Sequence, residues 1–218
     1  MKLLFIPARS KKGVSLSFQT KGLPGRLGLA STIQFADSLK SIKSFLEKSG
    51  KKVFIGKSKS MSLEPGQVLG CNAEAAVQVQ KQVDAFLYIG TGRFHPLAIA
   101  LSTGKPVFIF NPETNQVTKL DENEIKKAKA MKKTQQIKFL SANSFGILVS
   151  TKPGQNKLKQ ALKLKNKLEK QRKKARIFMS DTFDINQLEN FPSIECWINT
   201  MCPGLSKEQP FVWIGDII

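Results

Sequence analysis

Short apolar runs alternate with longer amphipathic stretches along the whole chain. Strands are predicted where an apolar run is bounded by turn-forming residues, at Leu3–Ala8, Leu27–Ile33, Lys52–Gly56, Gln67–Gly70, Ala85–Thr91, Pro106–Phe110, Phe145–Ser150, Ala175–Ser180, Glu195–Asn199 and Phe211–Ile214. Helices are predicted at Phe35–Ser49, Ala73–Gln82, Pro96–Thr103, Glu122–Ser141, Gln155–Lys173 and Ile185–Asn190. Strands separated by helices predict an α/β fold of mostly parallel sheets with helices on both faces.

The order of these elements is repeated. Residues 31–57 and residues 150–181 each contain the end of a strand, a helix and a second strand. Each segment is followed by an apolar run that leads to a cysteine, QVLGC at Cys71 and ECWINTMC at Cys202. The repeat predicts two similar domains, each with a sheet of about four strands and a cysteine at the same topological point.

A turn-forming segment, NPETNQ, sets the predicted boundary between the two domains near residue 112. The domains are therefore expected at 23–112 and 113–218. Residues 1–22 fit neither of them, because the strand predicted at Leu3–Ala8 has no helix after it. The backbone groups of such an orphan strand need a sheet to pair with.

The chain is strongly basic, with a formal net charge of +19. This charge fits either an anionic partner such as RNA or a lysine-rich solvated surface. The lysines lie in helical stretches without interleaved aromatic residues, which favours the solvated surface and makes a nucleic-acid partner unlikely. No apolar run is long enough for a membrane span and no signal peptide is recognisable, so a cytoplasmic protein without a membrane partner is expected.

Three cysteines without a CxxC pair argue against a disulfide framework or a local zinc knuckle, and for metal ligands or free thiols. Cys71 follows Gly70 and precedes a predicted helix, whose dipole would favour a thiolate; the alternative is an inert buried thiol. Cys202 precedes Pro203, as iron–sulfur ligands often do; the alternative is a loop cysteine beside a turn. Cys196 lies six residues earlier in the same predicted strand, roughly 20 Å away, and is interpreted as a core residue.

A third motif, TGRFHPLAIA, follows the apolar run AFLYIG. Gly90 and Gly92 make a permissive loop, and Pro96 suits the first turn of a helix. Such a corner can hold an anion or a cofactor. The single histidine, His95, is compatible with acid–base chemistry, with a substrate contact or with a structural cap.

Taken in order, the motifs FIPARSK, STIQFADSLKSIKSFLEKSGKKVFIG, EPGQVLGCN, TGRFHPLAIAL and WINTMCP resemble those of the diphthamide synthase family, of archaeal type. The resemblance covers nearly the whole chain. It implies three similar α/β domains, each of which contributes one cysteine to a [4Fe–4S] cluster. The cluster cleaves S-adenosylmethionine reductively, and the resulting 3-amino-3-carboxypropyl radical adds to one histidine of translation elongation factor 2.

On this resemblance, residues 23–112 correspond to the second family domain, residues 113–218 to the third, and residues 1–22 to the last strand of the first domain with a linker. Cys71 and Cys202 become the expected metal ligands. His95 becomes a candidate catalytic residue, and Gln34, Gln67 and His95 become candidates for binding S-adenosylmethionine. Family members form homodimers or heterodimers, so an oligomer is expected.

Two features depart from the family pattern. The first cysteine motif is absent from this sequence, and Gly204 stands where the family usually has an arginine. The first departure predicts a separate chain that carries the first domain and the third cysteine. The alternatives are a non-catalytic scaffolding relative of the enzyme and a basic RNA-associated protein.

Overall fold

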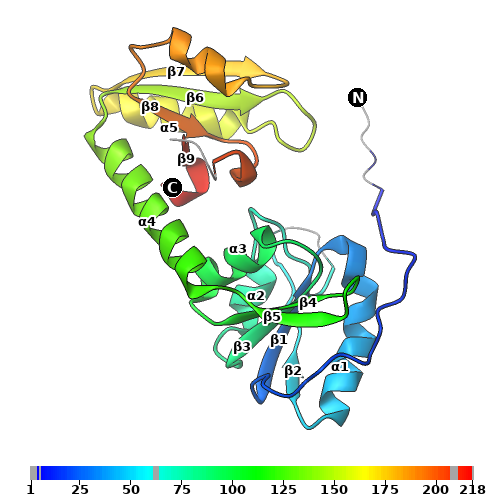
Figure 1. Ribbon diagram of the computed structural model, residues 1–218. Helices are drawn as coiled ribbons and strands as arrows, with labels where there is room; N and C mark the ends of the chain where they lie inside the picture. The colour runs from blue at the N-terminus through cyan, green and yellow to red at the C-terminus, as the bar shows by residue number, and fades with distance from the viewer. Residues whose placement is uncertain (1–3, 5, 61–63, 207–210, 218) are drawn as a thin grey trace. The chain divides into compact units, whose positions relative to one another are not determined.

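The computed structural model describes residues 4, 6–60, 64–206 and 211–217, and it divides the chain into two compact units, Met1–Lys127 and Ala128–Ile218 (Figure 1). Each unit is built on its own sheet with helices against it. The predicted α/β fold with two similar, mostly parallel sheets is therefore confirmed.

The first unit has a five-stranded sheet in the order β2-β1-β3-β4-β5. Its strands are β1 (Arg26–Ser31), β2 (Lys52–Phe54), β3 (Ala85–Ile89), β4 (Val107–Asn111) and β5 (Gln116–Lys119). The first four are parallel, and β5 returns antiparallel to β4. A 3-10 turn, η1 (Ile33–Ser38), and helix α1 (Leu39–Lys48) follow β1, while α2 (Glu74–Val79) and α3 (Phe94–Thr103) flank β3.

Two hydrophobic cores cover the two faces of this sheet. Ile42 and Leu46 of α1 pack on one face, and Ala75, Ala76 and Ile99 of α2 and α3 pack on the other. The residues of β3 are all buried, as expected for a central parallel strand covered on both sides.

The second unit has a four-stranded, wholly parallel sheet in the order β7-β6-β8-β9. Its strands are β6 (Ser144–Ser150), β7 (Lys174–Ser180), β8 (Cys196–Asn199) and β9 (Phe211–Trp213). Helix α5 (Leu158–Lys170) joins β6 to β7, and three short 3-10 turns are η2 (Ile185–Asn190), η3 (Pro203–Ser206) and η4 (Ile214–Asp216). Helix α4 (Glu122–Ser141) begins in the first unit and ends in the second.

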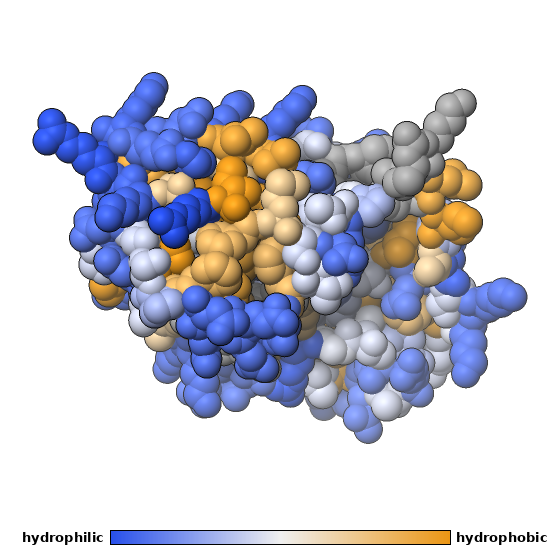
Figure 2. All heavy atoms as spheres, turned by 90° about the horizontal axis from the view of Figure 1, so that it is seen from above, coloured by the Kyte–Doolittle hydropathy of each residue, from blue (hydrophilic) through white to orange (hydrophobic). Residues whose placement is uncertain are grey.

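The two faces of the second sheet are covered unequally. Ala161, Leu164 and Leu168 of α5 fill the core on one face. The other face is covered mainly by η2, and Phe191 beside it remains 40% exposed. Figure 2 shows apolar side chains gathered on this side of the molecule and bordered by hydrophilic ones. In the first unit, helices cover both faces of the sheet, as predicted. In the second unit, α5 covers one face of the sheet, and the described element on the other face is the 3-10 turn η2.

The repeat seen in the sequence is visible in the strand register. Gly28 of β1 lies opposite Phe86 of β3, and Gly146 of β6 lies opposite Trp197 of β8. A Cβ atom at Gly28 would lie 2.4 Å from the Phe86 ring, and one at Gly146 would lie 2.2 Å from the Trp197 ring. In both units, therefore, a glycine on the central strand gives room to an aromatic side chain on its neighbour.

Two predicted strands are wrong. Leu4 and Ile6–Ala8 form no strand, because the structure offers them no sheet to pair with, whereas Leu3 and Phe5 lie outside the described residues. Gln67–Gly70 forms only isolated bridges, from Gln67 to Ser31 and from Leu69 to Asn72. Pairing with β1 does not extend beyond Gln67, because the chain turns at Gly70 and Cys71 and Leu69 pairs with Asn72 instead.

The predicted boundary near residue 112 also differs from the structure, which divides the chain after Lys127. The turn at 112–115 is present, but it joins β4 to β5 inside the first sheet. Sequence reasoning did not predict β5, whose residues are mostly polar and exposed.

The two cysteines do not lie at the same topological point. The two sheets can be compared strand by strand, with β2-β1-β3-β4 of the first corresponding to β7-β6-β8-β9 of the second. In this comparison β8 corresponds to β3. Cys202 follows β8, whereas Cys71 lies between β2 and β3, before α2. The prediction was wrong because the apolar run before Cys71 resembles a strand in sequence but is not the counterpart of β8.

Candidate functional site

Cys71 lies at the tip of a tight turn beside the carboxyl end of β1. Ser31, the last residue of β1, accepts a hydrogen bond from the backbone N–H of Val68 at 2.9 Å. Leu69 and Asn72 then pair through two backbone hydrogen bonds of 2.8 and 3.1 Å, which leaves Gly70 and Cys71 as a two-residue loop. The thiol-bearing residue is exposed. This edge of a parallel sheet is where ligands bind in α/β proteins.

Polar side chains anchor this turn to the start of α2. Asn72 accepts a hydrogen bond from the N–H of Glu74 at 2.9 Å and donates one to Ser60 at 3.1 Å. The Glu74 carboxylate accepts from Ser58 at 2.6 Å and from the backbone and hydroxyl of Ser60 at 3.0 and 2.5 Å. These hydrogen bonds lower the pKa of Glu74 to about 2. The segment around residues 58–60 is thereby tied to the residues that follow Cys71.

The loop motif with His95 packs against the same turn. A Cβ atom on Gly70 would lie 2.0 Å from the Phe94 ring, so only glycine admits this contact. His95, in the first turn of α3, stacks on the buried Tyr88 of β3 with ring centroids 6.0 Å apart. Burial raises the pKa of Tyr88 to about 12, against the opposing effect of a hydrogen bond with Thr32. The structure thus brings the Cys71 turn, Phe94 and His95 to one edge of the first sheet.

The two glutamines predicted to line the site are placed differently from each other. Gln67 is 8% exposed, and its side-chain oxygen accepts from the N–H of Glu64 at 3.0 Å, so it already shapes the loop. Gln34 is exposed in η1, and its carbonyl accepts from the N–H of Ser10 at 2.9 Å. Both residues follow or flank the carboxyl end of β1, but of the two only Gln34 presents its side chain to solvent.

Cys202 is held by a second turn, at the carboxyl end of β8. The side-chain oxygen of Asn199 accepts from the N–H of Met201 at 2.8 Å, and its amide nitrogen donates to the Cys202 carbonyl at 2.9 Å. The Thr200 hydroxyl donates to the carbonyl of Leu148 on the adjacent strand β6 at 2.7 Å. Asn199 is fully buried, whereas Cys202 is exposed. A buried asparagine therefore holds an exposed cysteine in a fixed turn.

Cys196 has a different environment. It is the first residue of β8 and is fully buried in the core on the α5 side of the sheet, and burial raises the pKa of its thiol to about 11. A neutral thiol packed among aliphatic side chains is a poor metal ligand. The interpretation of Cys196 as a core residue agrees with this placement.

Sequence reasoning missed three residues at these edges: Asn199, Tyr88 and Phe94. Asn199 stands at the end of an otherwise apolar run, WIN, where a polar residue in a buried strand is a usable signal. Tyr88 is the single tyrosine of the chain. Within the described ranges, no group of three or more His, Cys, Asp and Glu side chains is arranged to hold a metal ion by itself. No helix among the described residues is long and apolar enough to cross a membrane.

Comparison with known proteins decides the family. Residues 2–210 match the family model described as "Putative diphthamide synthesis protein". The chain belongs to this diphthamide synthesis family. The 2-(3-amino-3-carboxypropyl)histidine synthase of Pyrococcus horikoshii is 33% identical over 221 residues, which cover 99% of this chain and 62% of that protein. Subunit 1 of the enzyme of the same name in Schizosaccharomyces pombe is 33% identical over 202 residues, covering 88% of this chain and 45% of that protein.

Solved structures of the diphthamide synthesis family agree with the fold. The crystal structure of Dph2 from Pyrococcus horikoshii with 4Fe-4S cluster matches with a TM-score of 0.75 and 32% sequence identity, covering 88% of this chain and 56% of that one. This chain therefore spans between two fifths and two thirds of the length of the relatives it matches.

Proposed function

We propose that this chain is a subunit of a 3-amino-3-carboxypropyl transferase that modifies a histidine of translation elongation factor 2, the first step of diphthamide formation. The observation that supports this proposal best is the pair of exposed cysteines, each on a fixed turn beyond the carboxyl end of a strand. The proposal also draws on the family, in which relatives are named for this synthase activity and one solved relative carries a 4Fe-4S cluster.

The residues present suit an iron–sulfur cluster in their donor chemistry. Thiolates are the usual ligands of such clusters, and Cys71 and Cys202 are the two cysteines that solvent reaches. Both would act as ligands, each contributed by one unit. When bound, the [4Fe–4S] cluster would supply the electron that cleaves S-adenosylmethionine, whose 3-amino-3-carboxypropyl group is transferred to the acceptor imidazole.

Other residues at the edge of the first sheet would bind and orient the co-substrate. His95 is fixed in orientation by its stack on Tyr88, which suits a contact with S-adenosylmethionine or with the acceptor histidine. Gln34 presents an amide to solvent and would bind polar groups directly. Gln67 would act by holding the loop before Cys71, because its own oxygen is engaged by Glu64.

The third cluster ligand would come from outside these 218 residues. Cys196 is buried and protonated, and two thiolates leave one protein ligand to be supplied. We propose that a separate chain with the first family domain supplies it and docks near the N-terminal segment, where Leu4 is 84% and Ile6 is 79% exposed. The transferase would then be active only in an oligomer with this partner.

Anaerobic reconstitution tests the proposal. The wild-type chain is mixed with iron, sulfide and the candidate partner chain, and iron content and transfer from labelled S-adenosylmethionine to elongation factor 2 are measured. We expect iron binding and transfer only when the partner is present. Cys71→Ser and Cys202→Ser should each abolish iron binding and transfer. Cys196→Ala is the matched control and should retain iron.

Two results would contradict the proposal in different ways. A stable four-iron cluster with turnover in the lone chain, lost on Cys196→Ala, would show that the third ligand is wrongly assigned. Iron binding without any transfer to elongation factor 2 would instead favour a non-catalytic, scaffolding relative of the enzyme.

A further inference from the structure

Polar residues make up the outer face of α5, apart from Leu162, which is 45% exposed. Helix α5 buries Ala161, Leu164 and Leu168 against the sheet. Seven polar positions that face away from the sheet are exposed: Lys159, Gln160, Lys163, Asn166, Lys167, Lys170 and, at the C-cap, Gln171. We call these seven residues the α5 lysine face.

Positive charge is concentrated around this face beyond the average of the chain. Residues 157–176 contain ten of the 35 basic residues but only one of the 16 acidic ones, Glu169. Glu169 pairs with Lys165, which lies outside the face. In the described part of the chain, no carboxylate pairs with Lys163, Lys167 or Lys170. Like charges at i and i+4 destabilise a helix, so a row of them is an electrostatic cost that a bound anion would remove.

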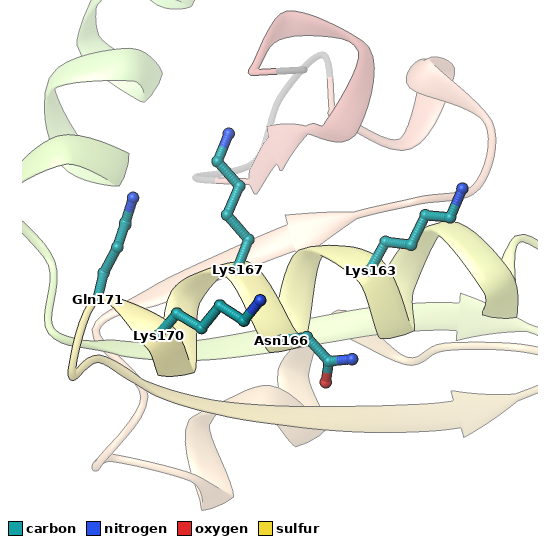
Figure 3. A pocket seen from close by; sticks show the side chains of 5 residues that line it. All are labelled: Lys163, Asn166, Lys167, Lys170 and Gln171. Carbon is teal, nitrogen blue, oxygen red and sulfur yellow. The ribbon is translucent and has the colours of Figure 1, made fainter.

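An open surface depression of about 410 Å³ lies among the side chains of the face. It is lined by Lys163, Asn166, Lys167, Lys170 and Gln171 (Figure 3). Sites for drug-like molecules are lined mainly by apolar side chains, and this depression has none among its lining residues. Ammonium groups and side-chain amides are instead the donors that proteins use for phosphate oxygens.

We propose that the α5 lysine face binds the phosphodiester backbone of a nucleic acid without reading its sequence. At a rise of 1.5 Å per residue, Lys163, Lys167 and Lys170 span roughly 10 Å along the helix. A nucleic-acid strand carries about one negative charge per 3.4 Å, so three lysines match roughly three phosphates. This surface is independent of the proposed transferase function.

An acidic protein is the competing occupant, and the composition of the face argues against it. Protein interfaces are enriched in aromatic residues at their centre and depleted in lysine. The exposed aromatic residue of this unit, Phe191, packs with Phe178 and Trp197 on the sheet face opposite α5. The lack of interleaved aromatic residues, which made a nucleic-acid partner unlikely on sequence alone, rules out base stacking on the α5 lysine face but not contacts with the phosphodiester backbone.

Fluorescence anisotropy of labelled 20-nucleotide single strands of RNA and DNA tests this inference on the full chain. The triple variant Lys163→Gln, Lys167→Gln and Lys170→Gln removes the three charges, and Gln has nearly the helix propensity of Lys. We expect its affinity to fall about tenfold or more, and the slope of log K against log salt concentration to become less steep by about 2. The triple Lys→Arg variant at these positions should retain binding.

Helix α4 offers a matched control. Lys126, Lys129 and Lys133 are exposed, form no salt bridge with another described residue and span the same length of helix. Their triple Gln variant changes the net charge equally and should bind like the wild type.

Three results would overturn the proposal. These are an equal loss of affinity in the two triple variants, no binding of nucleic acid by the wild type, and competition by polyglutamate as effective as that by RNA, which would indicate an acidic protein. Equal binding of RNA and DNA supports contacts with the backbone, whereas tighter binding of one shows which nucleic acid is the ligand.

Discussion

At the scale of single residues, the three cysteines differ in solvent exposure. Cys71 and Cys202 are exposed, while Cys196 is fully buried with a pKa raised to about 11. Reaction of a thiol with an alkylating agent requires both access and the thiolate form. Burial therefore removes Cys196 from this chemistry on both counts.

This difference predicts the thiol reactivity of the native protein. At pH 8 and without metal, iodoacetamide should modify Cys71 and Cys202 at least tenfold faster than Cys196, as followed by peptide mass spectrometry. In denaturant all three should react at similar rates, which serves as the control. Fast modification of Cys196 in the native protein would contradict its placement in the core.

The Asn199 side chain bonds to both residues that follow Thr200 in the turn at Cys202. Asn199→Ala leaves the N–H of Met201 and the carbonyl of Cys202 without their side-chain partner, and should lower the free energy of unfolding by about 2 kcal/mol. Urea unfolding measures this change, and iron binding at Cys202 should weaken with it. Asn190→Ala, at an exposed position in η2, should change stability by less than about 0.5 kcal/mol.

Glu74 gives the Cys71 region a defined pH dependence. Its pKa is lower in the folded state, about 2, than the ordinary value of 4.5, so its contribution to stability is present above pH 4.5 and is lost as the pH falls towards 2. Urea midpoints of the wild type should therefore drop more steeply over this range than those of Glu74→Gln. Glu189→Gln, at an exposed position in η2, should follow the wild type.

At the scale of elements, the Cys71 turn depends on its contact with α3. Gly70→Ala places a methyl group 2.0 Å from the Phe94 ring, and the turn or the helix must move. We expect a loss of about 1–3 kcal/mol in unfolding free energy and a lower iron content after reconstitution. The second substitution Phe94→Leu should restore part of both, whereas additive losses would contradict a direct contact.

A control for this element is available in the same unit. Gly25 directly precedes β1, and a Cβ atom at this position would have no other residue within 4 Å apart from its chain neighbours. Gly25→Ala should leave both stability and iron content close to those of the wild type. The contrast separates the close approach at Gly70 from a general effect of replacing glycine.

At the scale of the whole molecule, periodicity was enough to predict the class of fold and the repeat. Most strands and helices lie where the local pattern predicts them, and α4 occupies Glu122–Ser141 as predicted. The Gly28–Phe86 and Gly146–Trp197 pairs are one reason for the repeat, since in each unit a glycine on one strand makes room for an aromatic ring on the neighbouring strand. The family was predictable from several motifs that occur in a specific order along the chain.

Features that depend on pairing over long distances were not predictable from local pattern. The run Gln67–Gly70 is as apolar as a strand, yet its turn at Gly70 and Cys71 depends on the Leu69–Asn72 bridge and on Phe94. β5 is polar and exposed, so nothing in its sequence marked it as a strand. The role of Asn199 depends on the turn that it holds, which no spacing rule contains.

The position of β7 at the rim of the second sheet has a consequence for handling the protein. β7 is seven residues long, and within the described structure its outer side has no strand partner, so its backbone groups can template another chain. Lys174 and Arg176, both exposed on this strand, oppose such pairing by mutual repulsion between molecules. Salt at about 1 M shortens the range of that repulsion to about 3 Å. Concentrated stocks in high salt would therefore lose a kinetic barrier to β-sheet aggregation that low-salt stocks keep.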